Sequence, residues 1–195
     1  MILGILSDTH GQWRRTADAV RLLDRLGAEA LVHCGDVGSA DVLAELAGRR
    51  AWVVAGNTDV PDAPYFGGPD WPGITLGEGP LRVEVGGRRL VVFHGHETAF
   101  ENLWRDLIEN RAQPESFAGF EYVLHGHTHV PASLRLGAVR VINPGALHRA
   151  PRYTVATLDL AADRVRFWEV RDGRSEEPPV RLDLRGLGPP GRGSR

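Results

Sequence analysis

The chain has 195 residues, of which 42% are hydrophobic and 25% charged, and its formal net charge is −2. These values are typical of one globular domain, and the near-neutral charge argues against a broad electrostatic surface for duplex DNA or an anionic membrane. A single cysteine excludes an intrachain disulfide and a cysteine-rich zinc module, and because all 23 basic residues are arginine the chain has no lysine for a P-loop or a Schiff base.

The N-terminal part of the chain alternates between predicted strands and predicted helices. Residues 1–6, 30–33 and 51–55 are short apolar runs followed by polar residues, as expected for buried strands. Residues 12–26 carry apolar side chains at helical spacing, and we expect Ser39 to cap a second helix over residues 39–47. This alternation predicts βαβ crossovers and a parallel sheet.

Beyond residue 60 the pattern changes. Residues 61–79 are rich in proline and glycine and predict a loop. Gly86-Gly87 between two apolar runs is typical of a two-residue hairpin turn. The other predicted elements are hairpins over residues 80–93, 132–142 and 153–170, a helix over 99–110 and a strand over 121–124. We therefore expect the second part of the chain to be mostly antiparallel.

The composition changes again near residue 172, where glycine, proline, arginine and glutamate dominate. We expect one domain over residues 1–171 and a flexible tail over residues 172–195, with residues 180–184 as a candidate edge strand. No apolar run approaches the roughly 18 residues of a membrane helix. The apolar start is interrupted by Asp8 and has no basic segment before it. These features predict a cytoplasmic protein without a signal peptide or a membrane segment.

Polar residues follow five of the predicted strands. They form the motifs Asp8-Thr9-His10, Gly35-Asp36, Gly56-Asn57-Thr58-Asp59, His94-Gly95-His96 and His125-Gly126-His127-Thr128-His129. Because the carboxyl ends of parallel strands share one edge of a sheet, we expect the five motifs to converge on one cleft. Carboxylate, imidazole and amide oxygen are ligands of divalent transition metals. The sequence therefore predicts a metal site at this edge.

Each motif also has a simpler interpretation. An aspartate in a turn usually caps the backbone, and Gly-Asp or Gly-Asn is common in turns without any ligand. Gly-His-Thr-His is the most specific motif, because it places two imidazoles on either side of one residue. Each motif alone could be an ordinary turn. Five such motifs, each at the end of a predicted strand, are not expected by chance and favour a metal site.

The motifs resemble the signature of calcineurin-like metallophosphoesterases. The turn Asn143-Pro144-Gly145 with Pro151-Arg152 is similar to the small bacterial and archaeal branch of YfcE-type phosphodiesterases. The resemblance spans residues 1–170. It implies an α/β (α+β) fold built as a four-layer αββα sandwich, in which two mixed sheets are flanked by helices and the metal site lies at the strand carboxyl ends.

The resemblance also implies two metal ions. One would be held by Asp8, His10, Asp36 and His129, and the other by Asp36, Asn57, His94 and His127. Asp36 would bridge the ions, since a carboxylate offers two oxygens. Two divalent ions, two carboxylates and a bridging hydroxide leave one positive charge, which suits a phosphodiester anion. Metals about 3.5–4 Å apart activate the bridging water and hold phosphate oxygens for in-line attack.

One position departs from the pattern. Many members of the superfamily that this chain resembles have a histidine after the ligand asparagine, which protonates the leaving group, whereas this chain has Thr58. A threonine hydroxyl is not a useful acid. We therefore name His96 as a candidate proton donor or substrate contact, while a solvent-exposed role for it is equally supported. Asp59 would orient an imidazole placed at position 58.

The other histidines have less specific interpretations. His33 is expected to pack beneath the site and orient Asp36 rather than bind metal. His125 is expected to be structural. For His148 and Arg152, contact with substrate and a plain surface position are equally supported.

The sequence thus predicts a dinuclear phosphodiesterase for small or nucleotide-like substrates. Mn²⁺ is favoured, and Fe, Zn²⁺ and Ni²⁺ also suit mixed histidine, aspartate and asparagine ligation. A catalytically weak scaffold, like the retromer subunit of this fold, would share the architecture, although the seven intact ligands argue against it. The same motifs would also suit a phosphomonoesterase or a nuclease. Duplex nucleic acid and membranes are not expected partners, and a homo-oligomer is left open.

Overall fold

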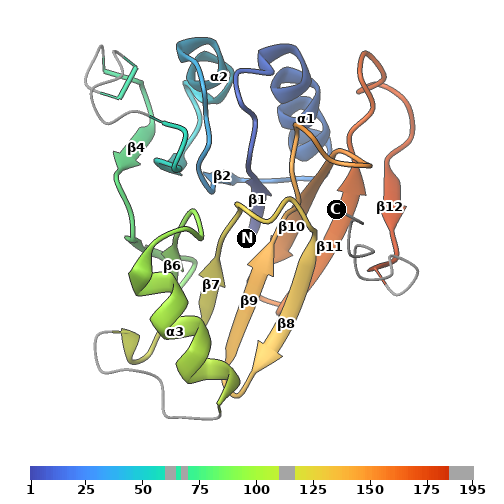
Figure 1. Cartoon of the computed structure of the whole chain (residues 1–195). Coiled ribbons are helices and arrows are strands. Elements are labelled where there is room, and N and C mark those ends of the chain that lie inside the picture. Colours follow the sequence, from blue (N-terminus) through green and yellow to red (C-terminus); the bar gives the residue numbers. More distant parts are fainter. Residues whose placement is uncertain (60–64, 67–69, 110–116, 185–195) are drawn as a thin grey trace, which may run out of the picture.

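Two β-sheets pack face to face, and helices cover the outer face of each (Figure 1). The computed structural model describes residues 1–59, 65–66, 70–109 and 117–184. Within these residues the four layers are helices, a seven-stranded sheet, a five-stranded sheet and a further helix. The predicted αββα sandwich with two mixed sheets is confirmed.

The seven-stranded sheet is built from both ends of the chain. Its strands and covering helices are β1 (Ile2–Leu6), α1 (Trp13–Arg25), β2 (Ala30–His33), α2 (Ala40–Leu46), β3 (Ala51–Val54), β4 (Ile74–Gly77), β10 (Thr154–Asp159), β11 (Arg164–Glu169) and β12 (Val180–Leu182). The strand order is β12-β11-β10-β1-β2-β3-β4. Strands β1 to β4 are parallel, as the alternating pattern predicts, and β10 to β12 join them antiparallel.

The five-stranded sheet comes from the middle of the chain. Its elements are β5 (Leu81–Val85), β6 (Arg88–Val92), α3 (Thr98–Ile108), β7 (Tyr122–Leu124), β8 (Ala132–Leu136) and β9 (Val139–Asn143), and the strand order is β5-β6-β7-β9-β8. The two edge pairs are the predicted antiparallel hairpins, but β6, β7 and β9 are parallel to one another. The expectation of a mostly antiparallel second part is therefore wrong for the centre of this sheet, because α3 forms a crossover between β6 and β7.

Two local predictions need correction. Residues 74–77, expected to be loop, form β4 beside β3, since a four-residue run between glycines is too short to show a pattern and is fixed by pairing. Residues 61–64 and 67–69 of that predicted loop, and residue 110 of the predicted helix, lie outside the described residues. Ser39 is the N-cap residue of α2, but its side chain makes no capping hydrogen bond.

The hairpin between β5 and β6 shows why the chain needs glycine at its turn. Gly86 and Gly87 have φ values of 57° and 70°. Both lie in the left-handed region that a type I′ turn requires and that glycine adopts without strain. The predicted two-residue turn is thus confirmed.

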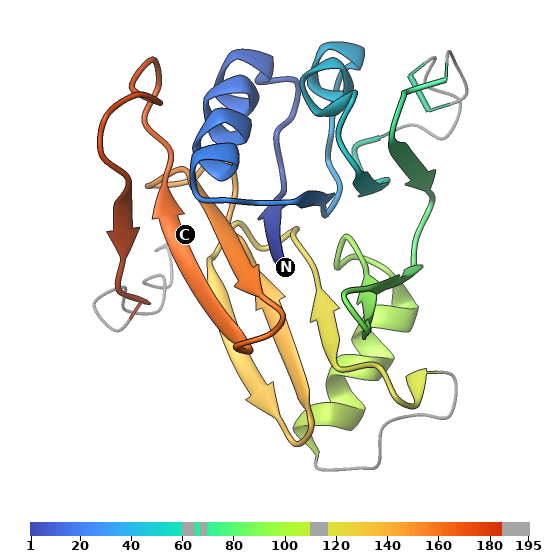
Figure 2. The ribbon, with the colours of Figure 1, turned by 180° about the vertical axis from the view of Figure 1, so that it is seen from behind.

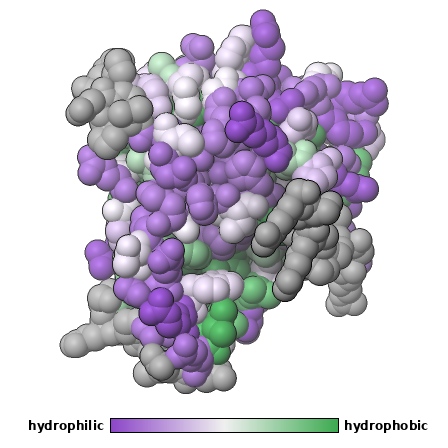
Figure 3. Space-filling model, viewed as in Figure 1, coloured by the Kyte–Doolittle hydropathy of each residue, from purple (hydrophilic) through white to green (hydrophobic). Residues whose placement is uncertain are grey.

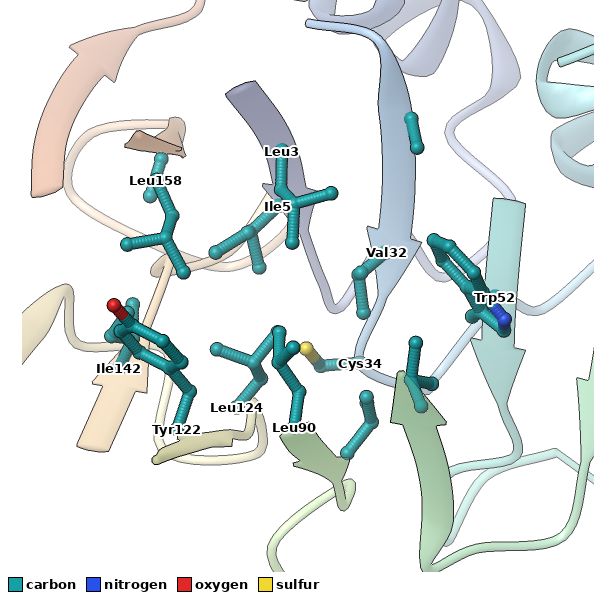
Figure 4. Packing of buried hydrophobic residues seen from close by; sticks show 14 of the residues in the cluster. Leu3, Ile5, Val32, Cys34, Trp52, Leu90, Tyr122, Leu124, Ile142 and Leu158 are labelled. Atoms are coloured by element: carbon teal, nitrogen blue, oxygen red, sulfur yellow. The ribbon is translucent and has the colours of Figure 1, made fainter. Parts of the chain in front are cut away.

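The main hydrophobic core lies between the two sheets (Figure 4). Leu3, Ile5 and Val32 from the first sheet face Leu90 and Leu124 from the second, and all five are fully buried. Two further cores lie beneath the helices, one under α1 and α2 (Figure 2) and one under α3. Together these cores fix the two sheets relative to each other. The loops at the carboxyl ends of the strands therefore have fixed relative positions.

One large apolar side chain lies at the surface of the helical layer. Trp13 is 38% exposed, because it is the first residue of α1 and lies off the face that packs on the sheet. Cys34 is fully buried. On the face shown in Figure 3, hydrophilic residues cover α1 and α2, and hydrophobic side chains show beside α3. Among the described residues, no helix has the length and apolar character that crossing a membrane requires.

A short part of the predicted tail, residues 180–182, belongs to the sheet. β12 pairs with β11, as expected for an edge strand within residues 180–184. Residues 185–195 lie outside the described residues. The boundary after residue 171 stays a prediction.

Candidate metal centre

The loops after β1, β2, β3, β6 and β7 bring polar side chains together where the carboxyl ends of the two sheets meet. The ligand atoms of Asp8, His10 and His129 lie within 4.8 Å of one another, and those of Asp8, Asp36 and His94 form a second such group. These five residues belong to the seven predicted ligands. The convergence expected from the strand ends is therefore present in the structure.

Asp36 lies at the centre of the cluster. Its Oδ2 atom is 3.4 Å from Nε2 of His10 and 3.5 Å from Nε2 of His94. His94 Nε2 is also 3.0 Å from Oδ1 of Asn57. On the other side, His129 Nε2 is 3.2 Å from Oδ1 of Asp8. The Asp36 carboxylate thus lies between His10, which belongs to one predicted ligand set, and His94, which belongs to the other.

The outer nitrogens of two imidazoles fix which nitrogen faces the cluster. His94 Nδ1 donates to the Cys34 carbonyl at 2.8 Å, and His129 Nδ1 donates to the Arg149 carbonyl at 3.4 Å. In the neutral imidazole each Nε2 therefore carries a lone pair. These lone pairs point at oxygen acceptors of Asn57 and Asp8, so a cation or a proton is needed between them.

Two buried atoms of the cluster lack a hydrogen-bond partner among the described residues. They are Oδ1 of Asp8 and Nε2 of His10. Buried polar atoms are almost always paired, because leaving one unpaired costs about 1–3 kcal/mol. The two atoms face the cluster, and a divalent cation would satisfy both. The residues present therefore fit a metal centre.

The backbone of the site is strained. Left-handed φ values between 42° and 66° occur at Asp8, His10, Asp36, His127 and His129. Such values are uncommon for residues other than glycine, and they gather at sites where function requires them. Five of the seven predicted ligands share this feature. The left-handed backbone conformation directs the side chains of neighbouring residues toward the centre of the cluster.

Two glycines let the backbone approach the carboxylates. A Cβ atom on Gly56 would overlap Oδ1 of Asp36, and one on Gly126 would overlap Ser7 Oγ and crowd Oδ2 of Asp8. Gly56 and Gly126 are thus required by their contacts with two predicted ligands, Asp36 and Asp8.

The electrostatics of the cluster favour an ionised Asp36. Burial opposes the charge of Asp36, but His94 and the backbone N–H of Thr58 hold the pKa of Asp36 well below its usual value. For His94, burial also opposes the charge, yet hydrogen bonding to Asp36 leaves its pKa raised. The neighbouring Asp8 carboxylate raises the pKa of His129. A buried anionic site of this kind attracts cations.

His33 and Thr9 support the site from below. His33 Nδ1 accepts from the Gly35 N–H at 3.2 Å, and its Nε2 donates to Thr9 Oγ1 at 2.9 Å. Thr9 Oγ1 in turn donates to the Val37 carbonyl at 2.9 Å. Burial lowers the pKa of His33 to about 4, which keeps it neutral. His33 is therefore buried against the loops that carry Asp8 and Asp36, and its role in orienting Asp36 stays a prediction.

His125 and Asn143 hold the Gly-His-Thr-His loop. His125 Nδ1 donates to the Gly126 carbonyl at 3.1 Å, and its ring packs on Phe100 at a centroid distance of 4.6 Å. Asn143 Nδ2 donates to the same carbonyl at 2.7 Å and to Thr128 Oγ1 at 3.0 Å. His125 is structural, as expected, and burial lowers its pKa to about 4.

Asp59, a predicted catalytic residue, lies inside the loops. It is 5% exposed. Its Oδ2 accepts the N–H groups of Val37 and Gly56 at 3.0 and 2.8 Å, and its Oδ1 accepts the Gly38 N–H at 2.9 Å and the Tyr65 hydroxyl at 3.1 Å. Asp59 therefore fixes the β2 and β3 loops to each other. A catalytic role for it stays a prediction.

His96, the other predicted catalytic residue, lies at the mouth of the cluster. Its side chain is 37% exposed, and its ring centroid is 5.4 Å from that of His94 and 6.3 Å from that of His127. Sequence reasoning missed its neighbour Glu97, which accepts the N–H groups of His94 and Gly95 at 2.8 and 2.6 Å. Its position directly after the histidine motif, at the start of a helix, was the available signal.

His148 also reaches the cluster, with its ring centroid 5.2 Å from that of His10. Thr58 Oγ1 is 3.5 Å from His10 Nδ1 and its N–H donates to Asp36 Oδ1 at 2.9 Å. Arg152 is exposed, and no contact with another described residue places it in the site. Thr58 therefore lies beside two predicted ligands, where it can orient them.

Comparison with known proteins agrees with this geometry. Residues 1–163 match the family model described as the calcineurin-like phosphoesterase superfamily domain. The chain is 27% identical to a probable metallophosphoesterase of Bacillus subtilis over 92% of this chain and 98% of the relative. It is 26% identical to a phosphodiesterase of Methanocaldococcus jannaschii over 74% of this chain and 83% of the relative.

The fold is likewise shared with solved structures. The structure of YfcE, a phosphoesterase from E. coli, superposes with a TM-score of 0.60 at 23% identity, covering 93% of this chain and 98% of that one. The predicted family, including its similarity to YfcE-type proteins, is confirmed.

Proposed function

The chain belongs to the calcineurin-like phosphoesterase superfamily and is a metal-dependent phosphoesterase, and on that premise we propose that it hydrolyses phosphodiesters of small or nucleotide-like molecules with two divalent ions. One observation carries the proposal. Asp8 Oδ1 and His10 Nε2 are buried, face the cluster and lack a hydrogen-bond partner among the described residues. Because buried polar atoms are rarely left unpaired, two such atoms in one cluster favour a bound cation.

The seven predicted ligands divide into two sets. Asp8, His10, Asp36 and His129 would hold one ion, and Asp36, Asn57, His94 and His127 the other. Support comes from the position of Asp36 Oδ2 between the imidazoles of His10 and His94. Mn²⁺ is the favoured ion, since mixed nitrogen and oxygen ligation suits it, and Fe, Zn²⁺ and Ni²⁺ suit the same donors.

The chain's own residues prepare the reaction. When bound, two metal ions would activate water and hold phosphate oxygens. The Cys34 and Arg149 carbonyls keep the lone pairs of His94 and His129 directed into the cluster, where they would hold the ions. Asp8 and Asp36 would supply two negative charges, which only partly offset two divalent cations. The excess positive charge would favour binding of an anionic ester.

Two arguments favour diesters over monoesters. A diester carries one negative charge, which balances the charge left on the proposed site. The Methanocaldococcus jannaschii relative is named a phosphodiesterase. The absence of an imidazole at position 58 further favours leaving groups that depart as stable anions, because general acid catalysis matters most for basic leaving groups.

A hydrolysis panel tests the proposal. We expect the protein with excess Mn²⁺ to hydrolyse bis(4-nitrophenyl) phosphate faster than 4-nitrophenyl phosphate, and Asp36→Asn to hydrolyse neither. Cyclic nucleotides and short oligonucleotides test the nucleotide-like class and distinguish it from a nuclease. A wild type that binds two ions but hydrolyses no ester would instead favour a scaffold of the same fold.

A further inference from the structure

Arg15 on α1 joins three parts of the chain. Its Nε and Nη2 atoms each donate to the Asp172 carboxylate at 2.7 Å, and its Nη1 atom donates to the Leu147 carbonyl at 2.7 Å. The guanidinium also lies 3.5 Å from the ring centroid of Tyr153. Only 13% of the Arg15 side chain is exposed. Such a planar, forked contact cannot be reproduced by lysine.

The same helix fixes the next residue of the tail. Asp18 Oδ2 accepts the Gly173 N–H at 2.7 Å, and Asp18 is buried. Figure 2 shows the segment between β11 and β12 beside α1, and Figure 1 shows the same neighbours. The charges reinforce each other, because Arg15 lowers the pKa of Asp172 by hydrogen bonding. The first residues after position 171 are thus attached to the domain.

The Leu147 carbonyl leads directly to the metal centre. The Leu147 N–H donates to the Ser7 carbonyl at 3.2 Å, one residue before Asp8. Arg149, two residues after Leu147, has a left-handed φ of 47°, and its carbonyl accepts from His129 Nδ1. Since a left-handed arginine is strained, its neighbours must hold this conformation.

We propose that Arg15 and Asp172 are positioning residues of the metal centre. Asp172 holds the guanidinium, the guanidinium holds the Leu147 carbonyl, and the anchored turn presents the Arg149 carbonyl to His129. That carbonyl keeps the proton on Nδ1 and leaves Nε2 free for a metal ion. The inference rests on the proposed ligand role of His129. It also makes residue 172 part of the functional unit instead of a flexible tail.

The experiment compares the full-length wild type with Asp172→Asn and Arg15→Lys. Mn²⁺ binding is measured by titration, and the His129 tautomer is measured by nitrogen NMR of the metal-free protein. We expect the weaker Mn²⁺ site to lose about 10–100-fold in affinity in both variants, as when the partner of a metal-bound histidine is removed. The His129 proton should no longer be confined to Nδ1. Asp172→Glu keeps the carboxylate and should restore both readouts.

The matched control is Asp163→Asn. Asp163 makes a comparable fork with Arg140, at 3.0 and 3.2 Å, in the β10–β11 turn. It contacts none of the predicted ligands in the described residues. We expect its loss to lower thermal stability without changing Mn²⁺ affinity or the His129 tautomer.

Unchanged Mn²⁺ affinity and an unchanged tautomer in Asp172→Asn would overturn the inference, as would equal losses in Asp163→Asn. Neither readout depends on turnover. If the wild type hydrolyses no diester, the proposed function is wrong. The positioning role of Arg15 and Asp172 would still be decided by Mn²⁺ affinity and the His129 tautomer.

Discussion

The two sheets contribute different chemistry to one site. The loops of the seven-stranded sheet supply both predicted carboxylate ligands, Asp8 and Asp36, with the amide of Asn57 and one imidazole, His10. The loops of the five-stranded sheet supply only imidazoles, namely His94, His127 and His129. The pKa of the Asp36 carboxyl lies well below its usual value, whereas histidine is the side chain that ordinarily titrates near neutrality. Metal binding should therefore depend on the first sheet for negative charge and mainly on the second for proton release.

The largest expected effect tests the carboxylate side. Asp36→Asn removes a charge that both predicted ligand sets share, so we expect loss of paired metal binding. Turnover should fall by more than about 100-fold, the upper end for residues that merely orient a ligand. Elemental analysis and diester hydrolysis measure both. Two retained ions with normal turnover would refute the bridging role, and Asp163→Asn serves as the carboxylate control.

Acidification tests the imidazole side. In the metal-free protein the pKa values of His94 and His129 are raised, by contacts with Asp36 and Asp8 that outweigh burial. A raised folded-state pKa means that protonation stabilises the metal-free protein below the unfolded pKa of about 6.5 and that this gain is lost as pH rises through the folded value. Metal must displace those protons. Its affinity should thus begin to fall near neutral pH, by about tenfold per pH unit for each proton displaced.

Excess Mn²⁺ should restore activity lost at pH 6, since protons and metal compete for the same nitrogens. Titrations of activity against Mn²⁺ at several pH values measure this directly. Acid loss that no metal concentration reverses would argue against the imidazoles as ligands. Asp36 should not contribute in this window, because its pKa lies well below the usual value.

Metal removal tests whether the two sheets are coupled. Ions held by residues of both sheets bind the folded chain only, and ligand at 100 times its dissociation constant stabilises by about 2.7 kcal/mol. For a domain of this size we expect adding Mn²⁺ to raise Tm by about 5–10 °C. Scanning calorimetry with and without chelator checks this value. Asp36→Asn should abolish the shift, and an equal shift in that variant would place the stabilising ion elsewhere.

Much of this site could be predicted from sequence because its ligands follow strand ends. Apolar runs ending in Asp8, Asp36, Asn57, His94 and His127 fix both the strands and the edge at which they meet. The left-handed backbone at five of the predicted ligands could not be predicted, since it results from tertiary packing and aspartate and histidine do not require it. The short strand β4 was missed for a similar reason, because pairing with β3 and not a pattern defines it.

Contacts between residues far apart in the sequence could not be predicted either. Arg15 and Asp172 are 157 positions apart, and neither lies in a motif. A composition rich in glycine, proline and charge predicted a tail at residue 172, whereas two side chains of α1 bind its first residues. The composition of a segment indicates how much apolar surface that segment can bury. It does not indicate whether side chains of another element, here Arg15 and Asp18 of α1, form hydrogen bonds with it.

The smallest expected effect compares one residue from each sheet as a source of the leaving-group proton. Thr58 follows β3 and His96 follows β6, and both lie beside predicted ligands. If no acid acts at present, Thr58→His should raise turnover on alkyl diesters more than on aryl ones. The gain should be only about tenfold, below the 10²–10⁴ of a well-placed acid, because the oxygens of Asp59 are already bound by backbone N–H groups and Tyr65.

If His96 already donates the proton, Thr58→His should change little and His96→Ala should selectively slow esters with basic leaving groups. A series of aryl and alkyl diesters on the wild type and both variants separates the two cases. The slope of rate against leaving-group pKa is the decisive quantity, since only a proton donor flattens it. A wild type without any such slope, unchanged in both variants, would mean that departure of the leaving group does not limit the reaction and that neither sheet supplies the acid.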